Sequence, residues 1–205
     1  MRHNYFSIPG WFNMHEAYDQ LLNVCEDDDI IVEIGSFMGR STSYLATNVV
    51  NSQKKIKIFC VDTFEGSTEH GALNIPQDFY QEFEKNVQPF IDNGYVIPLQ
   101  GRSDDPQIIN FFADKSLKGI IVDGAHEYDA VKEDIINWWP KLKDDGYMVG
   151  DDIMLPAVRE ASKDAMKHLK IDSLTYLTGQ EQWFLATPEK ESKIKKLVPG
   201  VNCLK

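Results

Sequence analysis

The stretch IIVEIGSFMGRST at residues 30–42 decides the fold, because it joins an apolar strand to a glycine turn and the start of a helix. Residues 30–34 are apolar apart from Glu33, as expected of a parallel strand that is covered on both faces. Gly35 and Gly39 permit a tight turn directly after that strand. A strand followed by such a turn places a ligand site at the carboxyl edge of a parallel sheet.

Short β-branched runs and longer amphipathic stretches alternate along the rest of the chain, which is typical of an α/β protein. Further strands are expected at 56–61, 95–99, 119–122 and 147–149, followed by an antiparallel hairpin of 174–177 and 182–186. Pro98 cannot donate a ladder hydrogen bond, so its strand is expected at an edge. The sequence predicts a Rossmann-like, mostly parallel sheet of seven strands in the order 3-2-1-4-5-7-6, with helices on both faces.

Apolar residues recur at helical spacing between the strands. The segments 79–87 and 131–142 each have one apolar helical face, and Gly146 is expected to end the second helix. Segment 1–29 is expected to be helical and to lie across the sheet or over a ligand site. Its acidic end, residues 26–29, is expected to form a solvated turn.

The composition is that of one ordinary globular domain, expected to span residues 1–205. The net charge of -11 repels phosphate backbones and anionic membrane surfaces, so neither nucleic acid nor a membrane is expected as a partner. No apolar run reaches the ~18 residues of a membrane helix and no signal peptide is recognised, so a cytoplasmic location is expected. The three cysteines show no metal-binding spacing and are expected to be core thiols: Cys25, Cys60 and Cys203.

The glycine turn restricts the choice of ligand. A dinucleotide fingerprint would need glycine where Phe37 stands, and a P-loop would need a longer loop with lysine in place of Arg40. Asp62, at the end of the second strand, can accept hydrogen bonds from both ribose hydroxyls. A ribose acid without a pyrophosphate cradle suits a nucleoside such as S-adenosylmethionine, and Glu33, Gly35 and Asp62 are expected to bind it. The alternative is that Glu33 satisfies the loop amides and that Asp62 caps a turn.

Four motifs resemble those of class I S-adenosylmethionine-dependent methyltransferases over nearly the whole chain: VEIGSFMGRST, VDTFEGS, VDGAHEY and GDDI. The likeness is greatest to the small metal-dependent O-methyltransferases that act on macrolide sugars, and catechol O-methyltransferase is more distant. The resemblance implies a cofactor site made of Gly35, Phe37, Ser41, Asp62, Ser103 and Asp104, with the last two beside the adenine. Asp104 stands where these enzymes often have glutamine.

Three carboxylates are expected to converge at the carboxyl edge, because Asp123 ends the fourth strand and Asp151 and Asp152 end the fifth. Uncompensated, they would raise one another's pKa values, whereas a bound divalent cation would remove that cost. An all-oxygen set favours Mg²⁺ or Ca²⁺ over zinc. The alternative is that Asp151 or Asp152 caps the helix near Pro156 or faces solvent. The resemblance assigns the metal to all three aspartates, and Asp123 is also expected to reach the cofactor.

His126 lies three residues beyond Asp123, where it can reach a substrate held by the metal. An imidazole, with an ordinary pKa of about 6.5, suits general-base work near neutral pH. A solvated loop histidine is the alternative, but the sugar methyltransferases that the chain resembles have histidine here and the catechol enzymes have lysine. Trp11 and the stretch 64–76 are expected to cover the cofactor or the acceptor.

These expectations describe an O-methyltransferase that uses S-adenosylmethionine and a divalent cation, releases S-adenosylhomocysteine and acts on a hydroxyl of a small polar acceptor. A sugar or a glycosylated natural product is the favoured acceptor. The alternatives are a catechol or phenol acceptor, a nicotinamide oxidoreductase, which Phe37 disfavours, and a non-catalytic cofactor-binding module of the same fold. A homo-oligomer is compatible with the sequence.

Overall fold

A computed structural model describes residues 1–66, 78–171, 174–177, 181–185 and 201–204, with the backbone alone at 174–177 and 201–204. Its strands are β1 (Ile30–Ile34), β2 (Lys57–Asp62), β3 (Val96–Gln100), β4 (Leu117–Val122), β5 (Leu142–Gly150), β6 (Leu174–Leu177), β7 (Trp183–Leu185) and β8 (Val201–Leu204). Its helices are α1 (His15–Val24), α2 (Arg40–Ser52), α3 (Phe79–Asp92), α4 (Pro106–Asn110), α5 (Tyr128–Trp138) and α6 (Pro156–Leu169), with single 3-10 turns at Tyr5–Ser7 and Trp139–Lys141.

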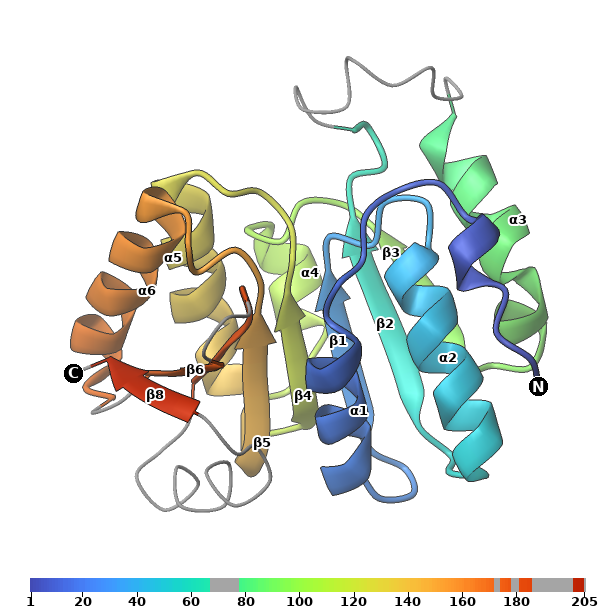
Figure 1. The fold of residues 1–205 in the computed structure, drawn as a ribbon, viewed down its shortest axis with the longest axis horizontal. Coiled ribbons are helices and arrows are strands. Elements are labelled where there is room, and N and C mark those ends of the chain that lie inside the picture. The colour runs from blue at the N-terminus through green and yellow to red at the C-terminus, as the bar shows by residue number, and fades with distance from the viewer. Residues whose placement is uncertain (67–77, 172–173, 178–180, 186–200, 205) are drawn as a thin grey trace.

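The strands form one sheet in the order β3-β2-β1-β4-β5-β7-β6-β8 (Figure 1). Strands β1 to β5 pair in parallel, which confirms the expected Rossmann-like order of this part. Strand β3 lies at an edge, as Pro98 predicts. Strands β7 and β6 continue the sheet as an antiparallel pair, and β8 adds a further strand beside β6. The expected count of seven strands is therefore wrong, because residues 201–204 pair with β6 as an eighth strand.

Helices cover both faces of the sheet, as expected (Figure 1). Neighbouring residues of β1 face opposite sides: Ile31 packs with α1, α2 and α3, and Val32 packs with α5 and α6. Leu21 of α1 lies so close to β4 that a Cβ at Gly119 would come within 2.8 Å of it. The expected N-terminal helix thus packs on the sheet. Among the helices described, none has the length and apolar character of a membrane span.

The boundary between α5 and β5 differs from the expected one. Helix α5 ends at Trp138, before Leu142, and Pro140 follows within two residues. Proline lacks the N–H that an α-helix needs, and the chain passes through the 3-10 turn at Trp139–Lys141 before it becomes extended at Leu142. Leu142 instead begins β5 and pairs with Leu117. Gly146, expected to end the helix, lies inside this strand, where a Cβ would come 2.9 Å from the Leu117 carbonyl oxygen.

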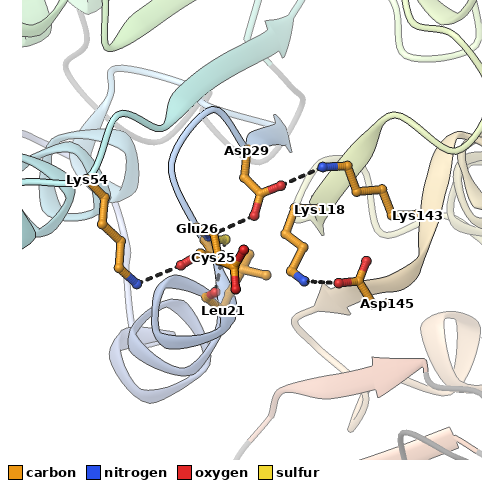
Figure 2. A network of polar contacts seen from close by, with 8 residues as sticks. All are labelled: Leu21, Cys25, Glu26, Asp29, Lys54, Lys118, Lys143 and Asp145. Carbon is orange, nitrogen blue, oxygen red and sulfur yellow. Dashed lines mark hydrogen bonds and ion pairs between the residues drawn. The ribbon is translucent and has the colours of Figure 1, made fainter.

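The acidic turn at residues 26–29 is not wholly solvated, contrary to expectation. Asp29 is buried, and its carboxylate accepts a hydrogen bond from Lys143 Nζ at 2.6 Å (Figure 2). The buried ammonium of Lys118, on the neighbouring strand β4, pairs with the exposed Asp145 of β5. These contacts join the turn after α1 to β5 and hold β4 against β5, at the end of the sheet opposite the expected ligand site.

The described cysteines are buried and unbridged, as expected. Cys25 and Cys60 are free thiols in the core. Burial raises the pKa of Cys25 to about 12, so it stays protonated and unreactive. The side chain of Cys203 and residues 67–77 of the expected covering loop lie outside the described residues.

Candidate active site

The carboxylate of Glu33 shapes the glycine turn from inside the protein. It is fully buried and accepts hydrogen bonds from Tyr18 Oη at 2.9 Å, from Ser36 Oγ at 2.7 Å and from Thr42 Oγ1. These hydroxyl groups offset the cost of burying a charged group. Glu33 therefore binds groups of the protein itself. Its partners are hydroxyl groups, whereas the alternative drawn from the sequence named the amides of the loop. Glu33 does not line the cavity described below.

Gly35 lets the ends of β1 and β4 approach each other. Its φ is +88°, and a Cβ there would lie 2.1 Å from the carbonyl oxygen of Asp123. A side chain at this position is excluded by the protein's own backbone, before any ligand is considered. The glycine thus brings the turn after β1 against the acidic end of β4.

Asp62 combines the two roles that the sequence left open. Its carboxylate accepts hydrogen bonds from the backbone N–H of Phe37 at 2.8 Å and from that of Phe64 at 2.7 Å. It also lines the cavity. Since each carboxylate oxygen can accept more than one hydrogen bond, these loop contacts leave capacity for ribose hydroxyls.

A cavity of about 1270 Å³ opens at the carboxyl ends of β1, β2, β4 and β5. Ligand pockets commonly measure roughly 300–1,000 Å³, so this one has room for a nucleoside cofactor together with an acceptor. Most of the expected site residues line it: Gly35, Phe37, Ser41, Asp62, Ser103, Asp123, His126, Asp151 and Asp152. Glu33 and Asp104 do not. The lining also contains residues that were not predicted as ligand contacts: Asn13, Arg40, Asp134 and Glu181.

The N-terminal segment borders this cavity, with residues 10–13 in its lining. Arg40 holds the segment by donating a hydrogen bond from Nη1 to the carbonyl oxygen of Gly10 at 2.7 Å. At the other end, Gln182 Nε2 donates to Asn13 Oδ1 at 3.2 Å. Trp11 is 65% exposed at the cavity, where an aromatic surface can meet an incoming molecule. No sequence pattern indicates the contacts of Arg40 and Gln182, because their partners are distant in the chain.

An acidic cluster lies at the ends of β4 and β5. Asp123, His126 and Asp152 can each supply one ligand atom within 4.8 Å of the others. His126 Nε2 lies 2.8 Å from Asp152 Oδ2. Asp151 is not in this group, and its Oδ1 accepts a hydrogen bond from Gln182 Nε2 at 2.8 Å. Both aspartates lie beyond the end of β5, where Asp152 has a φ of +60°, and the contact with Gln182 holds Asp151 while His126 completes the group.

The electrostatics of the cluster suit a bound cation. Burial raises the pKa of Asp123 well above its usual range, and the negative charges of Asp151 and Glu33 raise it further. Burial also raises the pKa of Asp151 to about 6. The carboxylates of Asp123 and Asp152 are oxygen donors that fit a divalent cation, and a cation would relieve this repulsion. The residues present therefore fit the expected metal.

Asp134 is a site residue that the sequence reading missed. It lies on α5, is 3% exposed and lines the cavity together with Ser103. Burial raises the pKa of Asp134 to about 7, and a hydrogen bond with Ser103 opposes that rise. A signal was available, because Asp134 falls on the apolar face of its helix between Val131 and Trp138. A charged residue at a core position often marks a binding site.

The comparisons with known proteins agree with this geometry. A family model described as a methyltransferase domain matches residues 32–153. Uncharacterized protein y4gI of Sinorhizobium fredii (strain NBRC 101917 / NGR234) is 28% identical over 112 residues. That match covers 55% of this chain and 12% of the relative, so the chain spans only a small part of the relative's length.

Three solved structures share the fold. The O-methyltransferase NovP has a TM-score of 0.63 at 16% identity, over 85% of this chain and 78% of NovP. CalS11, a TDP-rhamnose 3'-O-methyltransferase of calicheamicin biosynthesis, has a TM-score of 0.59 at 17% identity, over 84% and 77% of the two chains. A Staphylococcus aureus protein assigned as a caffeoyl-CoA O-methyltransferase has a TM-score of 0.59 at 14% identity, over 88% and 87%.

These identities are low enough that the structural likeness establishes the fold alone. The family match is the stronger finding, since it covers more than half of the chain and contains both the glycine turn and the acidic cluster. On this evidence the chain belongs to the methyltransferase domain family.

Proposed function

We propose that this protein transfers the methyl group of S-adenosylmethionine to a hydroxyl oxygen of a small polar acceptor, a sugar or a glycosylated natural product, with the help of a divalent cation. The observation that carries the proposal is that the glycine turn and the acidic cluster line the same cavity. The glycine turn and Asp62 line the cavity where they would hold the nucleoside, and Asp123 and Asp152, with His126 beside them, line the same cavity where they would hold the cation.

The cofactor end is built for a nucleoside without phosphates. Asp62 accepts the ribose hydroxyls while its bonds to the N–H groups of Phe37 and Phe64 fix its orientation. The described loop has Phe37 where a dinucleotide site needs glycine. The methyl group of a sulfonium is already activated, so the protein's main tasks are to align the acceptor oxygen and to remove its proton.

The acidic end is suited to the second task. A divalent cation held by Asp123 and Asp152 would lower the pKa of an acceptor hydroxyl and orient it. His126, which lines the cavity and lies 2.8 Å from Asp152, would accept the proton through an imidazole nitrogen. Gln182 holds Asp151 and Asn13 through one amide and so ties the acidic end of the cavity to the N-terminal segment.

Two observations favour a sugar acceptor. CalS11, which shares the fold, is a TDP-rhamnose 3'-O-methyltransferase, and His126 stands where the resemblance to sugar methyltransferases implies a histidine. A phenolic acceptor is the second candidate, because Trp11 and Phe37 line the cavity and could bind a ring.

A methyl-transfer screen with labelled S-adenosylmethionine tests the proposal. It compares nucleotide sugars, glycosides, catechols and caffeoyl-CoA, each with Mg²⁺ and with excess EDTA. Transfer to a sugar hydroxyl that requires Mg²⁺ supports the proposal. Transfer to phenols alone would replace the acceptor class, and full activity in EDTA would contradict the metal role. Cofactor binding without transfer to any acceptor would instead indicate a binding module.

A further inference from the structure

The carboxyl group of Asp134 is a buried acid that the proposed chemistry does not use. It comes from α5 and lines the cavity with Ser103, on the loop after β3. The Ser103 carbonyl oxygen accepts a hydrogen bond from Trp138 Nε1 at 2.9 Å, which joins this loop to α5. Asp134 is therefore held at a fixed place in the cavity wall, away from the acidic cluster at β4 and β5.

Asp104, the residue expected beside the adenine, is engaged elsewhere. Its carboxylate forms a bidentate ion pair with Arg102, in which Nε donates to Oδ1 at 2.8 Å and Nη2 donates to Oδ2 at 2.7 Å. Asp104 does not line the cavity, whereas Asp134 does. Of these two acids, Asp134 on α5 is therefore the one that can face a ligand beside the loop after β3.

We propose that Asp134 recognises the adenine of the cofactor, at the base edge that carries the exocyclic amine and N1. The inference rests on the proposed function, since it takes Asp62 as the ribose acid. A neutral carboxyl has a carbonyl acceptor beside an O–H donor. This pair complements the amine donor and the N1 acceptor of adenine. A primary amide offers the same pattern of donor and acceptor.

The surroundings of Asp134 favour its neutral form. Burial raises the pKa of this carboxyl to about 7, with smaller contributions from the negative charges of Asp104 and Glu133. The Ser103 hydrogen bond and the positive charge of Arg102 act in the opposite direction. An ionised carboxylate would face the N1 lone pair and repel it. Cofactor affinity should therefore be highest below pH 7 and should fall as the pH rises through 7.

Calorimetric titration with two ligands tests this inference: S-adenosylhomocysteine and its analogue with purine in place of adenine, which lacks the 6-amino group. The wild-type protein should bind the analogue roughly 10-fold more weakly at pH 6. Asp134→Ala should weaken S-adenosylhomocysteine binding by about the same factor and should no longer distinguish the two ligands. The matched control is Asp129→Ala, an exposed aspartate on α5, which should behave like wild type.

Asp134→Asn supplies a test that does not depend on how well the alanine variant folds. Its amide should keep the affinity of wild type at pH 6 and should lose the decline above pH 7. Equal weakening of both ligands by Asp134→Ala would overturn the inference, because Asp134 would then act only through the Ser103 loop. An unchanged pH profile in Asp134→Asn would also overturn it. Wild-type protein that binds neither ligand would contradict the proposed function itself.

Discussion

At the scale of single residues, the site depends on how closely its parts approach. Gly35 allows the turn after β1 to touch the end of β4, so closely that a Cβ on Gly35 would lie 2.1 Å from the Asp123 carbonyl oxygen. Glu33 gathers three hydroxyl groups beneath the same turn. Both residues are needed to place the cavity wall, and neither has to touch a ligand.

The loss of stability in Gly35→Ala, compared with that in Gly94→Ala, tests how closely the turn after β1 approaches the end of β4. Both glycines have positive φ, but a Cβ at Gly94 has no atom within 4 Å. Gly94→Ala should cost only backbone strain, about 1 kcal/mol of unfolding free energy. Gly35→Ala should cost about 3 kcal/mol more, because the Asp123 backbone must move. Urea unfolding measures both, and equal costs would show that the approach of the two strands is not restrictive.

His126→Ala tests the proton acceptor. With the best acceptor from the screen, kcat should fall by roughly 10²- to 10⁴-fold, while cofactor binding stays nearly unchanged. The wild-type rate should also decline on the acid side, since a protonated imidazole cannot accept a proton. His168→Ala, at an exposed position in the last turn of α6, is the control. A loss confined to KM would make His126 an acceptor-binding residue.

At the scale of elements, the hydrophobic pattern and the positions of glycine and proline predicted most of the architecture. The strand at 30–34 was predicted with the bounds that the structure gives, and Pro98 correctly assigned β3 to an edge. The prediction missed the end of α5 because Leu142 continues the helical spacing, yet a 3-10 turn that contains Pro140 replaces the α-helix before it. Periodicity describes which side chains face the core, and it does not reveal where the backbone can no longer remain helical.

The ion pairs between elements could not be predicted from the sequence either. They lead us to expect different stability effects when Lys118 and Lys143 are replaced. The side chain of Lys118 is 8% exposed and its partner Asp145 is 70% exposed, so Lys118→Met leaves the partner in solvent and should change stability by less than about 1 kcal/mol. Lys143→Met leaves Asp29, 8% exposed, without its cation and should cost about 2 kcal/mol or more. Urea unfolding of both variants measures the difference, and a larger loss for Lys118→Met would contradict it.

At the scale of the whole molecule, the carboxyl edge gathers residues from segments far apart in the chain. The sequence predicted the acids at the strand ends, because parallel strands end at one edge. It predicted that Asp123, Asp151 and Asp152 converge, and it did not predict the side chains that engage them. His126 joins Asp123 and Asp152, and Gln182 engages Asp151 from just before β7, a strand added after the parallel part of the sheet. Such pairings depend on side-chain direction and on the register between distant strands.

The crowded acids make the stability of the molecule depend on pH and on metal. Burial raises the pKa of Asp151 to about 6 and also raises that of Asp123, so the folded protein binds these protons more tightly than the unfolded chain. Without metal, their contribution to stability falls as the pH rises from about 4 through 6. Mg²⁺ should therefore raise Tm more at pH 7.5 than at pH 5, where protons compete for the ligands. Thermal melts with and without Mg²⁺ measure this, and an equal or larger shift at pH 5 would contradict the cation site.

The most direct test of the central claim is calorimetric titration of the purified protein with S-adenosylhomocysteine and, separately, with NADH. The glycine turn, Asp62 and the large cavity predict one site for the sulfur nucleoside and none for the dinucleotide, whose pyrophosphate would meet Phe37 where its fingerprint needs glycine. Binding of S-adenosylhomocysteine alone is the predicted result. Binding of NADH without binding of S-adenosylhomocysteine would contradict the account.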